Sequence, residues 1–316
     1  MANNNKIPLI VIAGPTASGK TKLAVELAKI YDGEVISADS MQIYKEMRIA
    51  SAKPTAQEMQ GIPHHLIDIL DTDYQFSVAE YVDMAKRTID DVYSRGKTPI
   101  LCGGTGLYIS SLIDNIQFDE TSGDESLRQE LLLLAKEKGN HYLWEKLNNI
   151  DPETAKVVHE NNLSRVIRGI EYFELTGTKL SEQKVLSRRE SSPYNCCIIG
   201  LTFSDRSLLY DRINKRVDSM IATGLIEEAK YMFENCKTAT SRQAIGYKEL
   251  IPYFEGKESL EACIDKIKLE TRHYAKRQLT WFRRIDGIQW IELDKYIEYQ
   301  RIIENVKNII AKSEII

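Results

Sequence analysis

The segment from Ile7 to Thr21, IPLIVIAGPTASGKT, constrains the fold more than any other stretch of this chain. Residues 7–13 are apolar and β-rich, which predicts a short buried strand. Gly14 to Thr21 then reads G-x-x-x-x-G-K-T, a loop whose glycines let successive backbone N–H groups point at a phosphate. Apolar residues at helical spacing follow, at Leu23, Leu27 and Ile30. The order strand, loop, helix predicts a phosphate-binding loop in a parallel sheet.

Further strands alternate with helices in the first third of the chain. Residues 33–40 and 98–106 are predicted strands, and residues 77–96 are a predicted helix with Ser77 as N-cap and Glu80 three residues on. Such alternation produces a parallel sheet with helices on both faces. Because these strands end in glycine or small polar residues, we expect the ligand crevice at their carboxyl ends.

The pattern changes in the middle of the chain. Residues 112–195 contain helical stretches and no strong strand, and a buried strand follows at 196–203. We therefore expect a helical insertion, residues 112–195, within an α/β core formed by residues 1–111 and 196–316. Other elements expected in the core are helices at 205–223, 225–236 and 258–285 and a last strand at 287–293.

Composition narrows the class of protein. The chain has 316 residues, 43% of them hydrophobic, so it can bury a full core. Its net charge of -4 gives no overall basic field for nucleic acid. The five cysteines form no C-x-x-C pair, which argues against a zinc site or a disulfide framework. No apolar segment resembles a signal peptide or approaches the roughly 18 residues of a membrane helix, so we expect a cytoplasmic protein.

Two further polar segments follow predicted strands. Asp39, in SADSMQIY, can bind magnesium or act as a general base, but it can equally cap the next helix. In CGGTGLY the glycines around Thr105 either add N–H donors at the crevice or simply permit a tight turn. In the phosphate loop, Lys20 adds a positive charge and Thr21 offers a hydroxyl to a magnesium ion.

Basic residues gather on two later helices. Arg212 and Arg216 share a helix face, and TRHYAKRQLTWFRR mixes basic with aromatic residues. This mixture suits RNA, but the pattern alone is more typical of a solvated helix face with aromatic core contacts. His64 and His65 are adjacent and point to different faces, so we expect a loop there and no metal site.

Seven motifs occur in one order: GPTASGKT, SADSMQIYKEM, SAKPT, GIPHHLID, GGTGLY, SRQAIGYKEL and AKRQLTWFRR. Together, over residues 10–293, they resemble the tRNA dimethylallyltransferases, enzymes with a P-loop NTPase-like α/β core. Because no C-x-x-C finger follows the core, the resemblance is to the bacterial form. It implies transfer of a dimethylallyl group from dimethylallyl diphosphate to the exocyclic amine of the adenosine next to the anticodon in tRNA. Diphosphate leaves, and Mg²⁺ is the implied cofactor.

The resemblance also implies roles for individual residues. Asp39 would be the base, and Thr105 and Arg216 would hold the diphosphate and assist its departure, although Arg212 lies in the same matching helix. The diphosphate loop would be Gly14, Pro15, Thr16, Ala17, Ser18, Gly19, Lys20 and Thr21, with the metal at Thr21. Contacts to tRNA would come from Asp39, Ser40, Met41, Gln42, Thr105, Ser164, Arg165, Val166, Ile167, Arg168, Gln243, Ala244, Ile245, Gly246, Tyr247 and Lys248. The helical insertion would clasp the anticodon stem-loop.

Three other functions share the phosphate loop, whose default ligand is ATP. A small-molecule kinase would move a terminal phosphoryl group and use the insertion as a lid. An adenylate isopentenyltransferase would share Lys20 and Asp39 but should not need the insertion or the AKRQLTWFRR helix. A nucleotide-dependent RNA-binding switch would keep the loop and the basic helix without needing Asp39. Because one chain carries every part of the site, we expect a monomer.

Overall fold

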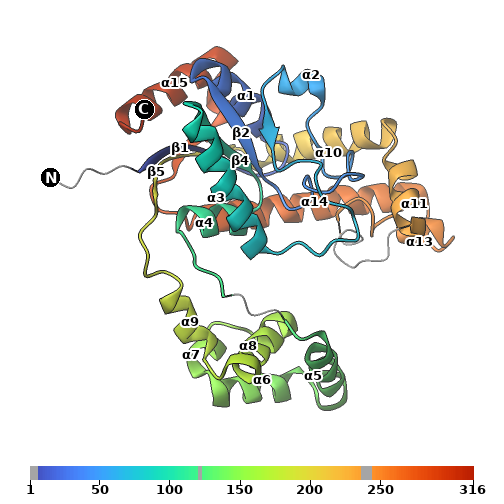
Figure 1. Ribbon diagram of the computed structural model, residues 1–316. Coiled ribbons are helices and arrows are strands. Elements are labelled where there is room, and N and C mark those ends of the chain that lie inside the picture. Colours follow the sequence, from blue (N-terminus) through green and yellow to red (C-terminus); the bar gives the residue numbers. More distant parts are fainter. Residues whose placement is uncertain (1–5, 120–122, 236–243) are drawn as a thin grey trace. The chain divides into compact units, whose positions relative to one another are not determined.

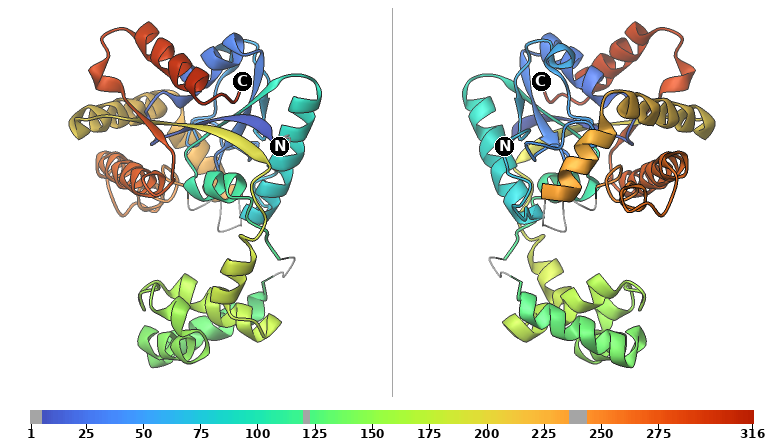
Figure 2. Two further views of the ribbon diagram at one scale, coloured as in Figure 1. Left: turned by 90° about the vertical axis from the view of Figure 1, so that its left-hand side faces the viewer. Right: turned by 90° about the vertical axis from the view of Figure 1, so that its right-hand side faces the viewer.

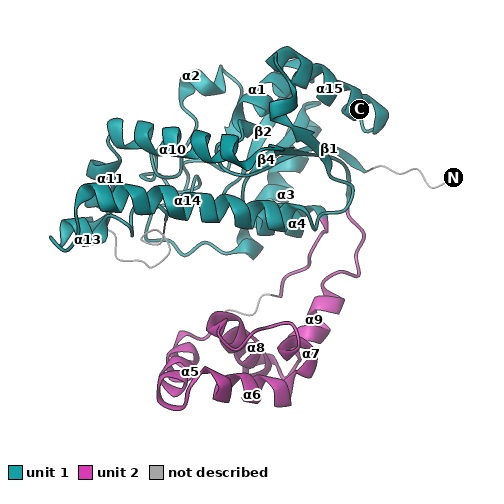
Figure 3. Ribbon diagram, turned by 180° about the vertical axis from the view of Figure 1, so that it is seen from behind, with its two compact units in different colours: residues 1–113, 193–316 teal, residues 114–192 magenta. Residues whose placement is uncertain are grey.

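The computed structural model describes residues 6–119, 123–235 and 244–316. The chain forms two compact units. Unit 1 consists of Met1–Ile113 and Pro193–Ile316, and unit 2 of Asp114–Ser192 (Figure 3). Each unit has its own buried core and is described separately.

Unit 1 is built on a six-stranded parallel sheet in the order β3-β2-β4-β1-β5-β6 (Figure 1). The central strand β1 pairs with β4 and β5, and Ala13 at its end lies opposite Gly103 of β4. Gly103 in turn lies opposite Ala38, the last residue of β2. The loops that follow β1, β2 and β4 therefore start side by side at one edge of the sheet. The strands are β1 Ile7–Ala13, β2 Gly33–Ala38, β3 His64–His65, β4 Thr98–Gly103, β5 Tyr194–Thr202 and β6 Gln289–Glu292.

Helices cover both faces of this sheet (Figure 2). Leu9 and Val11 of β1 pack in the hydrophobic cluster formed with α3 (Val78–Ser94) and α4 (Gly106–Ile113). Ile10 and Ile12 pack in the opposite cluster with α1 (Lys20–Ile30) and α15 (Tyr299–Lys312). A strand buried on both faces needs apolar residues at every position, which explains the continuous apolar run of β1.

Several local predictions are confirmed. β1 spans the predicted residues, and α3 begins with the capping box between Ser77 and Glu80. The strand predicted at 98–106 is shorter than expected, because β4 ends at Gly103 and α4 begins at Gly106. The strand predicted at 33–40 likewise ends at Ala38, before the turn that contains Asp39.

The loop predicted at His64 and His65 is wrong, because these residues form the edge strand β3 beside β2. His65 Nε2 lies 2.6 Å from Glu34 Oε2, and the Arg95 guanidinium also binds Glu34. This pair of contacts holds the pKa of Glu34 near 2, first through the Arg95 hydrogen bonds, against the effect of burial. The two-residue strand is thus held in place by side chains that a local pattern does not reveal.

The remaining helices of unit 1, apart from α2 (Ala56–Met59), surround a third hydrophobic cluster beyond the end of the sheet. It buries the segment after β2, at Ile43, Tyr44 and Met47, against these helices. Glu228 reinforces the packing, since its carboxylate accepts hydrogen bonds from three successive backbone N–H groups, those of residues 48–50. The helices around this cluster are α10 Arg206–Ala222, α11 Leu225–Asn235, α13 Ile251–Phe254 and α14 Leu260–Phe282, and a 3₁₀ turn, η1, spans Leu293–Lys295.

Unit 2 is helical throughout its described residues. Its core contains Leu143 and Leu147 of α6 and Val166 of α8. Helices α6 and α8 pack closely, since a Cβ at Gly169 would lie 2.6 Å from Leu147 Cδ1. The helices are α5 Glu125–Lys138, α6 Asn140–Ile150, α7 Pro152–Ala155, α8 Leu163–Thr176 and α9 Leu180–Leu186. No helix in the described parts of either unit is long and apolar enough to cross a membrane.

Candidate active site

The loop from Gly14 to Thr21 joins β1 to α1, as the motif predicts. Its backbone curls through left-handed conformations at Ala17 (φ 62°) and Gly19 (φ 87°). The Pro15 carbonyl accepts hydrogen bonds from Ser18 Oγ (2.8 Å) and Lys20 Nζ (2.7 Å). No side chain caps α1 at its N-cap residue Gly19, and the first-turn N–H groups of any helix lack intrahelical partners. The loop therefore presents backbone donors and the helix dipole at the strand ends.

Asp39 lies just past β2, and its side chain caps the turn that follows. Its Oδ1 accepts hydrogen bonds from the backbone N–H of Met41 (2.9 Å) and of Gln42 (3.4 Å). Within the described part of the chain, Oδ2 accepts none. The capping interpretation of Asp39 is thus correct for one oxygen, while the other oxygen stays available for a ligand or a proton.

Thr105 lies past β4 and is bonded to the turn that contains Asp39. Its Oγ1 accepts the Ser40 N–H at 3.0 Å, and its own N–H donates to the Ala38 carbonyl at 3.0 Å. One interpretation of the glycine-rich segment predicted additional N–H donors for a ligand. The backbone N–H of Thr105 is not such a donor, because it is already bonded to Ala38. The Thr105 side chain instead lies beside the turn that carries Asp39.

Lys20, Asp39 and Arg216 interact electrostatically at this edge of the sheet. The pKa of Lys20 is lowered to about 8, mainly by burial and also by the positive charge of Arg216, while Cys102 and Asp39 oppose the shift. Burial also lowers the pKa of Arg216, against the effect of Asp39. A bound anion would favour the charged forms of both cations.

Arg212 and Arg216 of α10 differ in their bonding. Arg212 Nε donates to the Ala17 carbonyl of the phosphate loop at 2.8 Å. Arg216, one helical turn further on, makes no hydrogen bond or ion pair with any described residue. Arg212 thus supports the loop, whereas the guanidinium of Arg216 retains its donors, which favours Arg216 over Arg212 as the residue for a bound anion.

The predicted tRNA-contact residues fall into three groups. Ser40, Met41 and Gln42 lie beside Asp39, and the Gln42 amide bonds the carbonyls of Ser51 and Ala52. Ala244 and Tyr247 are buried, Ile245 is partly exposed, Gly246 donates its N–H to Glu249, and Lys248 is exposed. Gln243 lies outside the described residues.

The third predicted group, Ser164 to Arg168, belongs to α8 of unit 2. Ser164 and Arg165 are exposed, and Arg168 is partly exposed and pairs with Glu171. Val166 and Ile167 are buried in the core of unit 2. Of this stretch, only the polar side chains are placed to contact a partner.

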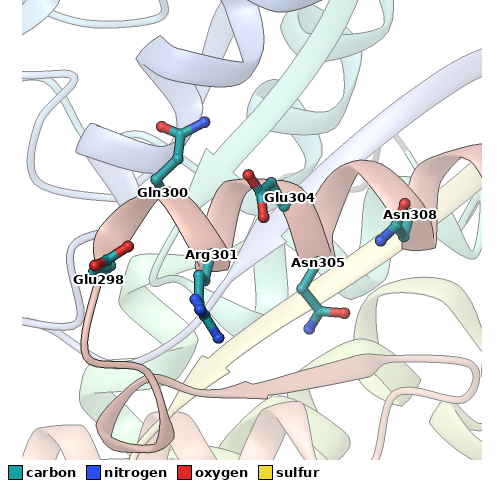
Figure 4. Close-up of a pocket in the computed structure, with 6 residues that line it drawn as sticks. All are labelled: Glu298, Gln300, Arg301, Glu304, Asn305 and Asn308. Carbon is teal, nitrogen blue, oxygen red and sulfur yellow. The ribbon is translucent and has the colours of Figure 1, made fainter.

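Two cavities lie away from these residues. The larger, about 440 Å³, is an open depression along α15 (Figure 4). A smaller one, about 90 Å³, lies between α10 and α14. The larger is lined by Glu298, Gln300, Arg301, Glu304, Asn305 and Asn308, and the smaller by Arg206, Leu209, Tyr210, Lys276, Leu279, Thr280 and Arg283. Neither includes a residue of the phosphate loop, Asp39, Thr105 or Arg216.

A sequence model of the family described as IPP transferase matches residues 42–285. The chain belongs to this family. Proteins named tRNA dimethylallyltransferase are similar over almost their whole length. The one from Thermoanaerobacter sp. (strain X514) is 49% identical over 308 residues, which cover 96% of this chain and 98% of that protein. The one from Halalkalibacterium halodurans is 46% identical over 307 residues, which cover 97% of each chain.

Solved structures of IPP transferase relatives agree with the fold. The full-length tRNA isopentenylpyrophosphate transferase from Bacillus halodurans is 45% identical and superposes with a TM-score of 0.73, covering 98% of this chain and 97% of that one. A eukaryotic dimethylallyltransferase acting on tRNA is 31% identical with a TM-score of 0.80, covering 97% of this chain and 80% of that one. The predicted α/β fold and the predicted transferase class are confirmed.

Sequence reasoning does not predict that three residues of α14 in this IPP transferase, Tyr274, Gln278 and Trp281, lie at the candidate site. The mixture of basic and aromatic residues left two interpretations open, an RNA surface and a solvated helix face with aromatic core contacts. The structure places these three on one face of α14, against the segment from Gly103 to Gly106, hereafter the glycine turn. Their spacing of four and three residues was the available signal, since it marks one helix face.

Proposed function

We propose that this IPP transferase moves a dimethylallyl group from dimethylallyl diphosphate to the N6 amine of the adenosine 3′-adjacent to the anticodon in tRNA. Diphosphate is the other product. The convergence of Lys20, Asp39, Thr105 and Arg216 at the ends of β1, β2 and β4 carries this proposal. Prenyl transfer from a diphosphate needs a base on one side of the reacting carbon and an anion site on the other, and this set contains both.

Asp39 is the proposed base. An adenine amine is a poor nucleophile, so its proton must be removed as it attacks. Asp39 Oδ1 is fixed by two backbone N–H groups, which orients the carboxylate and leaves Oδ2 for the amine proton. A base held this way needs little reorganisation when the reaction occurs.

The phosphate loop, Thr105 and Arg216 are the proposed diphosphate site. The leaving group gains negative charge as its bond to carbon breaks, so donors aimed at it lower the barrier. Lys20, with its pKa near 8, becomes fully protonated beside such an anion. Backbone donors at the N-terminus of α1, those of Gly19, Lys20 and Thr21, complete the site.

Mg²⁺ is the proposed metal, with the Thr21 hydroxyl as its protein ligand. The residues present fit this ion, because Mg²⁺ in phosphate sites takes only one or two protein oxygens besides the ligand's own oxygens and water. Thr21 is partly exposed in the first turn of α1, and its hydroxyl has no hydrogen bond within the described residues. The described residues contain no group of three or more acidic, His or Cys side chains that could hold a metal without the diphosphate. When bound, the ion would neutralise charge on the leaving diphosphate.

The proposed macromolecular substrate is the tRNA anticodon stem-loop. A stacked base cannot reach a partly buried carboxylate, so the adenosine must be flipped out, at a cost of a few kcal/mol. In unit 2, Ser164, Arg165 and Arg168 are the polar residues proposed to contact the RNA. In unit 1 the proposed contacts are Ser40, Met41, Gln42 and the residues 244–248. We further propose that the enzyme acts as a monomer in the cytoplasm, where its substrate is.

The experiment follows the mass of the RNA. Wild-type protein is incubated with anticodon stem-loop RNA, dimethylallyl diphosphate and Mg²⁺, and the RNA should gain one isopentenyl unit. Asp39→Asn should lower the rate by about 10²–10⁴-fold, the range for a lost general base, while RNA affinity stays unchanged. The matched control is Asp83→Asn, since Asp83 is an exposed carboxylate on α3 paired with Arg87.

Three results would count against the proposal. An RNA mass that does not change with wild-type protein contradicts the function. Full activity of Asp39→Asn contradicts the assignment of the base alone. Transfer of labelled phosphate from ATP to a small molecule would favour a kinase instead.

A further inference from the structure

Gln278 connects the two loops that border the proposed diphosphate site. It lies on α14 and is 5% exposed. Its Oε1 accepts the Thr16 N–H of the phosphate loop at 2.9 Å, and its Nε2 donates to the Gly104 carbonyl of the glycine turn at 2.9 Å. One side-chain amide therefore bridges the loop after β1 and the turn after β4, two neighbouring strands.

The chemistry of the two partners fixes the orientation of this amide. A backbone N–H can only donate, so Oε1 must face Thr16, and a carbonyl can only accept, so Nε2 must face Gly104. Both hydrogen bonds would be lost if the amide were flipped. The bridge is thus specific for glutamine, because leucine offers neither group and ionised glutamate offers only the acceptor.

The neighbours of Gln278 hold the bridge in place. A Cβ at Gly104 would lie 2.4 Å from Gln278 Nε2, so only glycine leaves room for the amide at that position. One turn earlier on α14, the Tyr274 phenol lies beside Thr105 and Gln278, and burial raises its pKa. One turn later, Trp281 Cδ1 would lie 2.3 Å from a Cβ at Gly106. One face of α14 therefore contacts every residue from Gly104 to Gly106.

We propose that Gln278 is a positioning residue, which holds the phosphate loop and the Thr105 side chain at a fixed separation so that the remaining donors of the loop and Thr105 act on the same diphosphate. This inference rests on the proposed function. The Thr16 N–H is itself occupied by Gln278, so it shapes the phosphate loop instead of contacting the ligand. Loss of the bridge would let the phosphate loop and the glycine turn move independently, and donors misplaced by 1 Å lower rates by about 10²-fold.

The test compares Gln278→Leu with wild type and with Thr280→Ala. Thr280 is an exposed residue on the same helix, and its hydroxyl bonds only the helix carbonyl of Lys276. Rates are measured at least 15 °C below each protein's own melting temperature. We expect Gln278→Leu to lower kcat by at least about tenfold and to raise the KM for dimethylallyl diphosphate. The Kd for stem-loop RNA and the kinetics of Thr280→Ala should match wild type.

Two further variants separate positioning from general stabilisation. Gln278→Glu keeps the acceptor for Thr16, and only its protonated form can donate to Gly104. The ratio of its rate to the wild-type rate should therefore rise as pH falls from 8 to 6. Gly104→Ala, which displaces the same amide from the opposite side, should reproduce the kinetic defect of Gln278→Leu.

A melting temperature that falls while kcat and KM stay at wild-type values would overturn the proposal, because it would show that Gln278 only stabilises the fold. A wild-type protein that does not prenylate RNA would instead overturn the proposed function. In that case the affinity for inorganic diphosphate tests the role of Gln278. Gln278→Leu should lower this affinity at least about tenfold. Unchanged diphosphate affinity in that experiment would overturn the bridge as well.

Discussion

The phosphate loop and the glycine turn are both rich in glycine, yet glycine is required for different reasons in each. In the phosphate loop, Gly19 has φ 87°, and the nearest atom to an added Cβ is Arg212 Nη2 at 3.9 Å. In the glycine turn, Gly103 and Gly106 lack room for a Cβ. Gly19 therefore needs glycine for its conformation, whereas Gly103 and Gly106 need it for close packing, as does Gly14, where a Cβ would lie 2.9 Å from the Leu201 carbonyl oxygen. A similar sequence pattern therefore indicates a ligand loop in one case and a helix-docking surface in the other.

Gly103→Ala should have the largest effect on stability. A Cβ there would lie 2.1 Å from the Ala38 carbonyl oxygen, a backbone atom that cannot move without separating β2 from β4. We expect the free energy of unfolding to fall by about 3 kcal/mol or more, at the upper end for overpacking. Urea denaturation measures this change, and a loss below about 1 kcal/mol would show that the strands can separate at low cost.

Gly106→Ala should cost less, because the obstructing group is a side chain, Trp281. We expect a loss of about 1–3 kcal/mol, the usual range for overpacking. A double-mutant cycle with Trp281→Ala tests the cause, and the two substitutions should couple by more than about 0.5 kcal/mol in the compensating direction. Additive effects would contradict the packing explanation.

Gly19→Ala should destabilise by about 1–2 kcal/mol, the cost of a left-handed backbone for an L-residue. Since the cause lies in the backbone, removing the nearest side chain with Arg212→Ala should not relieve it. The same double-mutant cycle by urea denaturation should give additive effects here. Coupling between Gly19 and Arg212 would show that packing, and not backbone conformation, requires glycine at position 19.

A further prediction concerns the charge of Lys20 in the phosphate loop. With a pKa near 8 in the free enzyme, Lys20 must gain a proton to bind an anion above that pH. The affinity for inorganic diphosphate should therefore fall by up to about tenfold per pH unit above 8, relative to Lys20→Arg, which stays charged. Calorimetric titration from pH 7 to 9.5 measures this ratio, and a constant ratio would contradict the shifted pKa.

The lowered pKa of Lys20 also makes the stability of the folded protein depend on pH. A lysine whose pKa is lower in the folded than in the unfolded state disfavours folding most below the folded-state pKa, where it is charged in both states, and this penalty declines as pH rises between the two pKa values. Wild-type stability relative to Lys20→Met should therefore rise as pH increases above about 8. Thermal melts of both proteins at pH 7.5 and pH 9.5 measure the difference, and a fall with pH would contradict it.

Local patterns in the sequence predicted the elements that depend on local interactions. The apolar run of β1 and the Ser77–Glu80 capping box are of this kind. Helix α15 was missed, although Ile302, Val306 and Ile310 recur at helical spacing and cover one face of the sheet. The spacing of these isoleucine and valine residues in the sequence is therefore sufficient to indicate this helix.

Other features could not be predicted from local patterns. Thr16 and Gln278 are separated by 262 positions, and no local pattern indicates that their amides meet. The two readings of Asp39 could not be separated either, because its two carboxylate oxygens differ in their bonding. The roles of the individual site residues stay predictions until the variants are measured.

The central claim is that the phosphate loop holds a leaving diphosphate, and one reaction tests it directly. Wild-type protein, stem-loop RNA, dimethylallyl diphosphate and Mg²⁺ are combined, and released diphosphate and RNA mass are followed in the same sample. We predict one diphosphate released for each isopentenyl unit gained by the RNA, with no requirement for ATP. Diphosphate release without an RNA product, or phosphoryl transfer that requires ATP, would contradict the account.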